Sequence, residues 1–197
     1  MNGRSSDVVW EESLISREQR WSTLGNRGAT VWFTGLSGSG KSSVAAACER
    51  LLMAAGRPAY LLDGDNLRFG LNGDLGFSID DRNENVRRVS EVARLFADAG
   101  FVALVPLISP YRAARERARD LHEIAGLLFL EVYLDTPIEV CEERDSKGLY
   151  ARARSGELTG FTGVDDPYEP PKSPDLVLSP DDGPAVAAAT QVLDLLT

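Results

Sequence analysis

Residue types that build many common functional sites are scarce in this sequence. Its 197 residues include two cysteines and one histidine. Cys48 and Cys141 stand far apart and neither belongs to a C-x-x-C pair, which argues against a structural zinc site or a disulfide framework. We expect both to be reduced core residues, and the single His122 argues against a histidine-rich metal site.

Long apolar runs and an excess of positive charge are also missing. No uncharged apolar run approaches the roughly 18 residues that span a bilayer, and the first residues hold no apolar segment typical of a secretory signal. These absences predict a cytoplasmic protein without membrane contact. The net charge of −9 disfavours a nucleic-acid binder, although the clustered arginines still suit an anionic ligand.

Alternating apolar runs and helical patterns predict the fold. Strands are expected at residues 29–34, 59–62, 101–107, 128–134 and 176–178, and helices at 41–55, 80–99, 112–125, 137–144 and 183–196. The first four runs are almost continuously apolar, as in strands buried on both faces. The pattern therefore predicts an α/β fold whose five-stranded parallel sheet is flanked by helices.

Two segments do not fit the alternation. Residues 1–27 are polar with scattered apolar anchors and predict an N-terminal arm, partly helical around 16–23, before a single domain at 28–197. Residues 145–174 are rich in Gly, Pro, Lys and Arg, with a short helix expected near 149–154. Such an excursion between strands is commonly a lid, and the alternative is an inert surface insertion.

The sequence GLSGSGKS at residues 35–42 fits the phosphate-binding P-loop pattern G-x-x-x-x-G-K-[ST]. It follows an expected strand and opens an expected helix, so its backbone N–H groups and the helix N-terminus face a phosphate. Lys41 would reach the β- and γ-phosphates, and Ser42 would bind Mg²⁺. The predicted ATP-binding residues are Gly35, Ser37, Gly38, Ser39, Gly40, Lys41, Ser42 and Ser43.

An acidic pair follows the second expected strand. Asp63 and Asp65 flank Gly64, and in extended geometry both side chains would point to the same side, toward the P-loop. One carboxylate can hold Mg²⁺ through water while the other accepts a proton from an attacking hydroxyl. The alternative is a solvated Asp-Gly turn.

Further charged and aromatic residues are candidates for an acceptor site and a lid. Phe77 and Phe161 lie in glycine-containing loops, where each can stack on a base or fold into the core. Arg68, Arg82, Arg87 and Arg88 suit an anionic substrate, whereas Lys147, Arg152 and Arg154 would place positive charge over ATP from the lid. The arginines at 112, 115, 117 and 119 indicate a solvated helix face.

These residues together predict a Mg²⁺- and ATP-dependent phosphotransferase with a small anionic acceptor. Guanine specificity is disfavoured because N-K-x-D is absent, and the H-R-D and D-F-G motifs of protein kinases are absent too. Residue chemistry leaves the acceptor open. A non-catalytic module that binds nucleotide and signals to a partner is the alternative of another class.

The sequence also resembles the adenylylsulfate (APS) kinases over nearly its whole length. The matching blocks, in the family's order, are VVWEESLISREQR, WFTGLSGSGKSS, LLDGDNLRFGLNGDLGFSIDDRNENVRRVSEVARLFADAG, ISPYRAARERAR and FLEVYLDTPIEVCEERDSKGLYARARSGELTGFTGVDDPYEPP. Three positions depart from the family's usual residues. Phe69 stands where many members have His, Ser43 where Thr is commoner, and Ser146 where Pro is common.

The resemblance implies phosphoryl transfer from MgATP to the 3′-hydroxyl of adenosine 5′-phosphosulfate (APS), on a P-loop kinase fold that is usually a homodimer. It implies catalytic roles for Asp65, Asp63 and Lys41. We expect Asp65 to act as the base and Asp63, with Ser42, to bind the metal; the roles of the two aspartates can be exchanged. The implied substrate positions are Asp65, Arg68, Phe77, Arg82, Asn85, Ser109, Lys147 and Phe161, the two phenylalanines enclosing adenine. Some members are fused to an ATP sulfurylase, so association with one is expected, and this chain is either stand-alone or a piece of such a protein.

Overall fold

A parallel sheet forms the centre of the molecule. The computed structural model describes residues 9, 11, 13–180 and 183–197. Its strands are β1 (Ala29–Thr34), β2 (Ala59–Leu61), β3 (Val102–Pro106), β4 (Leu128–Leu134) and β5 (Leu176–Leu178). They pair in parallel in the order β2-β3-β1-β4-β5, which confirms the predicted five-stranded parallel sheet.

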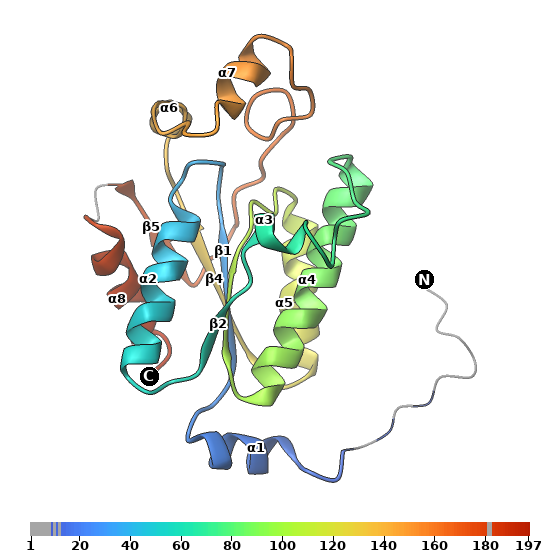
Figure 1. The fold of residues 1–197 in the computed structure, drawn as a ribbon, viewed down its shortest axis with the longest axis vertical. Coiled ribbons are helices and arrows are strands. Elements are labelled where there is room, and N and C mark those ends of the chain that lie inside the picture. The colour runs from blue at the N-terminus through green and yellow to red at the C-terminus, as the bar shows by residue number, and fades with distance from the viewer. Residues whose placement is uncertain (1–8, 10, 12, 181–182) are drawn as a thin grey trace.

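Helices cover both faces of the sheet (Figure 1). One face packs against α2 (Lys41–Ala54) and α8 (Ala185–Asp194), and the other against α4 (Ile79–Ala99) and α5 (Arg112–Ile124). All six residues of the central β1 are buried: Val31 and Phe33 join the first core cluster, and Trp32 joins the second. Because both faces of the strand pack against apolar side chains, its sequence is almost continuously apolar.

Helix α1 (Arg17–Leu24) packs below the sheet against the C-terminal end of α4 (Figure 1). Trp21 donates a hydrogen bond from Nε1 to the carbonyls of Ala97 and Asp98, and Arg17 and Arg20 pair with the Asp98 carboxylate. This helix agrees with the one expected around 16–23. The earlier part of the predicted arm lies largely outside the described residues.

The chain excursion after β4 lies beyond the carboxyl ends of the strands (Figure 1). Helix α6 (Ile138–Glu143) leads into the excursion, which contains α7 (Leu149–Arg154). Tyr150, Ala153 and Phe161 of the excursion form a small core together with Cys141 of α6. Cys48 and Cys141 are both free and buried, as predicted. None of the helices in the described part of the chain is long and apolar enough to cross a membrane.

One short helix was not predicted. Helix α3 (Gly64–Leu67) begins immediately after Asp63, where the sequence was interpreted as extended. Asp63 accepts hydrogen bonds from the backbone N–H groups of Asp65 and Asn66, which starts the helical turn. The expectation that extended backbone would align the two aspartates was therefore wrong.

Candidate active site

A pocket of about 710 Å³ opens at the carboxyl ends of the strands. Parallel α/β sheets commonly bind ligands at this edge. The pocket is lined by the P-loop, the acidic pair, the candidate acceptor residues and the base of the excursion. Of the residues that the family resemblance and the P-loop pattern assign to catalysis, ATP, metal or substrate, all except Gly35 line it, so the structure brings together segments separated by more than a hundred positions in the chain.

The P-loop backbone depends on glycine. Gly38 and Gly40 have positive φ angles of 76° and 101°, in the left-handed region that glycine occupies without strain. A Cβ atom on Gly38 would lie 2.8 Å from the carbonyl oxygen of Cys141, so this position also lacks room for a side chain. The loop passes directly into α2, whose N-terminus favours an anion.

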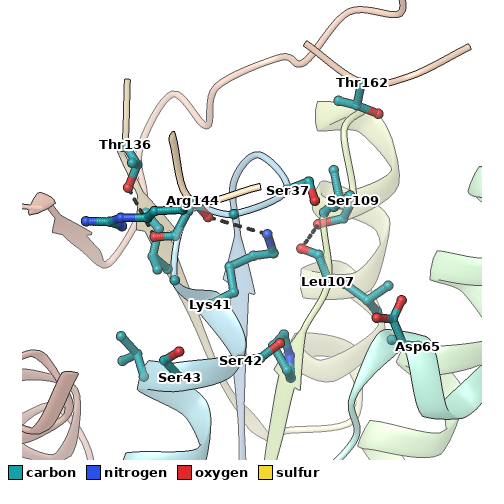
Figure 2. A pocket seen from close by; sticks show the side chains of 18 of the residues that line it. Ser37, Lys41, Ser42, Ser43, Asp65, Leu107, Ser109, Thr136, Arg144 and Thr162 are labelled. Carbon is teal, nitrogen blue, oxygen red and sulfur yellow. Dashed lines mark hydrogen bonds between the residues drawn. The ribbon is translucent and has the colours of Figure 1, made fainter. Parts of the chain in front are cut away.

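Lys41 points back onto this loop (Figure 2). Its Nζ donates to the carbonyls of Gly35 at 3.0 Å and Leu36 at 2.6 Å, and it lies 3.4 Å from the Ser39 hydroxyl. Burial lowers the pKa of the Lys41 ammonium to about 8, although the nearby Asp65 and Asp63 act in the opposite direction. A bound phosphate would offer this amine a full negative charge in place of neutral carbonyls.

The two aspartates have different surroundings. Asp63 uses Oδ1 to cap α3 and accepts a hydrogen bond at Oδ2 from the Ser42 hydroxyl, at 3.0 Å. Asp65 pairs with Lys147 from the excursion, and both side chains are largely exposed. The carboxylate of Asp63 is thus fixed beside the P-loop, whereas that of Asp65 extends over the open pocket.

The residues beside the P-loop fit Mg²⁺ bound together with a nucleotide. Ser42 and Asp63 present a hydroxyl and a carboxylate oxygen within 3.0 Å of each other at the start of α2. Mg²⁺ prefers oxygen ligands and usually keeps several waters and phosphate oxygens around one or two protein groups. The described residues contain no cluster of three or more acidic, histidine or cysteine side chains that would hold a metal without such help.

A second wall of the pocket carries the acceptor candidates. Phe77 is 62% exposed, and the guanidinium carbon of Arg68 lies 4.4 Å from the centre of its ring. Phe161 also lines the pocket but is 9% exposed, and its ring packs edge-on against Tyr150 with centroids 4.9 Å apart. The first ring is available for stacking, and the second is held rigidly within its own cluster.

Arg82 and Asn85 connect this wall to the excursion. Arg82 is buried and donates to the Phe77 carbonyl, the Thr162 hydroxyl and the Gly160 carbonyl at 2.9, 2.9 and 2.5 Å. Asn85 accepts a hydrogen bond at Oδ1 from Asn72 Nδ2, at 2.9 Å. Sequence reasoning missed Asn72, a fully buried residue in the GLN block that fixes the Asn85 side chain through this bond.

Several charged candidates lie outside the pocket. Arg87 and Arg88 both pair with Glu84, and Arg152 and Arg154 pair with Glu157 and Glu142. None of these four arginines lines the pocket. The predicted solvated face of α5 was also wrong at Arg115, which is 2% exposed.

Sequence reasoning also missed two residues that donate hydrogen bonds to the P-loop backbone. The Thr136 hydroxyl donates to the Ser39 carbonyl at 3.1 Å, and the Tyr150 hydroxyl donates to the Ser37 carbonyl at 2.9 Å. Both residues line the pocket. The single available signal was the position of Tyr150 in the KGLY block, and Thr136 follows β4 with no distinguishing pattern.

Comparison with known proteins identifies the family. The family model for adenylylsulphate kinase matches residues 27–179. The adenylyl-sulfate kinase of Clostridium acetobutylicum is 56% identical over 177 residues, which are 90% of this chain and 87% of that protein. The adenylyl-sulfate kinase of Saccharomyces cerevisiae is 50% identical over 192 residues, 98% of this chain and 95% of that protein.

A longer relative and two solved structures agree. The bifunctional enzyme CysN/CysC of Mycobacterium tuberculosis is 56% identical over 98% of this chain, which covers 30% of that protein. The APS kinase CysC of Mycobacterium tuberculosis, solved with AMPPNP and APS, has a TM-score of 0.84 and 60% identity over 87% of this chain and 98% of that one. A gluconokinase from Sinorhizobium meliloti, 20% identical with a TM-score of 0.57, shares the fold over 87% of this chain and 95% of that one. This chain belongs to the adenylylsulphate kinase family.

Proposed function

We propose a residue-level account of the adenylyl-sulfate kinase reaction in this ATP-dependent kinase. The enzyme transfers the γ-phosphoryl group of ATP to the 3′-hydroxyl of APS, which yields 3′-phosphoadenosine 5′-phosphosulfate. One observation carries the account: the P-loop, the acidic pair and the acceptor wall open into a single pocket. Donor and acceptor can therefore meet without a covalent enzyme intermediate, and positioning with charge stabilisation supplies most of the rate.

The ATP phosphates bind along the P-loop N–H groups and the N-terminus of α2. Lys41 leaves the carbonyls of Gly35 and Leu36 and contacts the β- and γ-phosphates, because an anion attracts the ammonium more strongly than neutral oxygens do. Ser42 and Asp63 would hold Mg²⁺, which would supply positive charge against the phosphate oxygens. The fixed position of the Asp63 carboxylate beside Ser42 supports this assignment.

Asp65 accepts the proton of the 3′-hydroxyl. The hydroxyl oxygen forms a bond to the γ-phosphorus, the bond from that phosphorus to the oxygen bridging to the β-phosphate breaks, and ADP leaves. Asp65 suits this role because its carboxylate extends over the pocket and its side-chain partner is the largely exposed Lys147. An exposed ion pair is weak, so the carboxylate is free to take a hydroxyl proton instead.

The acceptor lies against the second wall. Phe77 and Phe161 enclose the adenine of APS, and Arg68, Arg82 and Asn85 anchor the remaining groups. Ser109 and Lys147 complete the acceptor subsite, and all of these residues line the pocket. We further infer that residues 145–174 act as a lid on the domain formed by residues 28–197. The weak Lys147–Asp65 pair across the pocket mouth would open readily.

The assembly state and location form a further part of the proposal. We infer a cytoplasmic homodimer and an association with an ATP sulfurylase. The bifunctional CysN/CysC relative, of which this chain covers 30%, supports the association. A solved hexameric APS kinase from Thiobacillus denitrificans, 34% identical over 85% of this chain and 28% of that one, shows that a relative assembles into an oligomer.

ADP release from MgATP, measured with and without APS, tests the reaction. We expect release that depends on APS and a product phosphorylated at the 3′ position. Equal ADP release without APS, or phosphorylation of another acceptor alone in a panel of nucleotides and sugars, would overturn the proposal. ATP binding without any acceptor-dependent ADP release would instead indicate the alternative of a non-catalytic module that binds nucleotide and signals to a partner.

Two matched substitutions separate the roles of the aspartates. Asp65→Asn should abolish turnover while ATP binding and its Mg²⁺ dependence stay intact. Asp63→Asn should raise the Mg²⁺ concentration needed for half-maximal activity. Asp120→Asn, an exposed change on α5 outside the pocket, is the control. Near-normal kcat in Asp65→Asn would remove the base assignment, and an exchanged pattern would exchange the two roles.

A further inference from the structure

A buried arginine in α5 connects two segments that the proposed mechanism does not connect. Arg115 is 2% exposed, although guanidinium groups are seldom buried without partners. Its Nε donates to Glu131 at 2.7 Å, its Nη1 to the Ser109 carbonyl at 2.6 Å, and its Nη2 to the Glu169 carbonyl at 2.6 Å. All three guanidinium nitrogens are therefore used, and Glu131 in β4 supplies the compensating charge.

The first of these segments forms part of the acceptor wall. Ser109 lines the pocket and has a φ of 42°, a left-handed conformation that no other non-glycine residue adopts among the described residues. Its hydroxyl accepts a hydrogen bond from Trp32 Nε1 at 3.0 Å and donates to Thr34 Oγ1 at 3.1 Å. Such a conformation persists only where surrounding contacts determine it, and the bond from Arg115 determines the direction of the Ser109 carbonyl.

The second segment is the returning end of the excursion. The Glu169 N–H donates to the Pro110 carbonyl at 2.9 Å, and the Arg112 N–H donates to the Glu169 carboxylate at 2.8 Å. Tyr111 donates a hydrogen bond to Asp166 in the same segment. Residues 166–169 thus lie along residues 110–112 and form a junction with them. The Arg115 guanidinium donates hydrogen bonds to both sides of this junction, at the Ser109 and Glu169 carbonyls.

We infer that Arg115 is a positioning residue for the acceptor. It does not line the pocket, so it acts through Ser109 and through the junction at Glu169. Its three directed bonds hold the Ser109 loop and the returning end of the excursion in one relative position. The P-loop receives no bond from Arg115, so its loss should affect APS far more than ATP. The inference rests on the proposed function in assigning this wall to the acceptor.

Kinetics of Arg115→Met test the inference together with a charge-balanced double variant. We expect the KM for APS to rise about tenfold, while the KM for ATP stays within about twofold. Arg115→Met alone leaves the buried Glu131 carboxylate with only the longer ion pair to Arg119, at 3.9 Å. Arg115→Met/Glu131→Gln removes that charge, so the inference can still be tested if the single variant folds poorly. Arg117→Met, an exposed change on the same helix, is the matched control.

Hydrogen exchange supplies a readout that does not depend on any substrate. The N–H groups of Glu169 and Arg112 donate across the junction, so their exchange should accelerate in the Arg115 variants and not in Arg117→Met. Unchanged exchange at both amides would overturn the inference whether or not APS is the acceptor. Faster exchange with an unaltered KM for APS, or with equal rises in the KM values for APS and ATP, would show that Arg115 is merely structural. Either result would also overturn the inference. Absence of APS turnover in the unaltered enzyme would overturn the proposed function, and exchange would then still decide whether Arg115 positions the loop.

Discussion

Tyr150 connects the donor loop to the acceptor wall through two separable contacts. Its side chain is 3% exposed, its hydroxyl donates to the Ser37 carbonyl at 2.9 Å, and its ring packs edge-on against Phe161. Tyr150→Phe removes the hydroxyl and retains the ring. The variant should therefore disturb the P-loop and leave the position of Phe161 unchanged.

The expected size follows from the environment of this hydrogen bond. A neutral intramolecular hydrogen bond contributes about 0.5–1.5 kcal/mol net, and an acceptor left buried without a partner costs about 1–3 kcal/mol. Ser37 lines the open pocket, so water can reach its carbonyl and the cost stays near the lower value. We expect a decrease of about 1 kcal/mol in the free energy of unfolding. If the whole effect also appears in nucleotide binding, the KM for ATP rises by at most about fivefold.

Urea denaturation and steady-state kinetics measure the two effects on the same variant. Tyr133→Phe is the control, because the Tyr133 hydroxyl bonds to Asp135 in an exposed setting outside this pocket and should contribute little. Phe161→Leu is the complement: it removes the edge-on contact and should raise the KM for APS rather than that for ATP. This reasoning would be refuted if Tyr150→Phe left both the free energy of unfolding and the KM for ATP unchanged. It would also be refuted if the KM values for ATP and APS rose equally.

Three further predictions concern single groups. Phe77→Ala should raise the KM for APS by roughly 5- to 150-fold, since stacking on a base contributes about 1–3 kcal/mol; an unaltered KM would remove Phe77 from the acceptor site. Burial places the pKa of Lys41 at about 8, so the ligand-free amine loses its proton as pH rises through this value and phosphate attraction weakens. Calorimetric Kd values for a non-hydrolysable ATP analogue should therefore rise between pH 8 and 9.5, and a flat profile would contradict this titration. Burial also raises the pKa of the Cys48 thiol to about 12, so it stays protonated at pH 8 and should react with a disulfide reagent in urea but not in the native protein; rapid native labelling would refute the buried environment.

Much of the fold could be predicted because its signals are local. The predicted strand at 29–34 matches β1, and the helix at 112–125 differs from α5 by one residue, since continuous apolar runs and glycine-terminated periodic stretches mark such elements directly. Helix α3 has only four residues, too few for a periodic pattern. It forms because the Asp63 carboxylate caps it, and a cap of this kind also fits a simple turn.

The candidate site was predictable where chemistry depends on contiguous residues and unpredictable where it depends on distant partners. The P-loop sequence alone determined a phosphate-binding loop, because its glycines, Lys41 and Ser42 all belong to one short loop and the helix N-terminus that follows it. The sequence also predicted an acidic pair beside this loop, whereas residue chemistry alone left the two loop aromatics open between stacking on a base and folding into the core. Only the tertiary structure decided that Arg82 and Lys147 line the pocket while Arg88 pairs on the surface. Only the tertiary structure also buried Arg115 against Glu131, because the partner of a charged side chain is set by which elements pack together rather than by its neighbours in the chain.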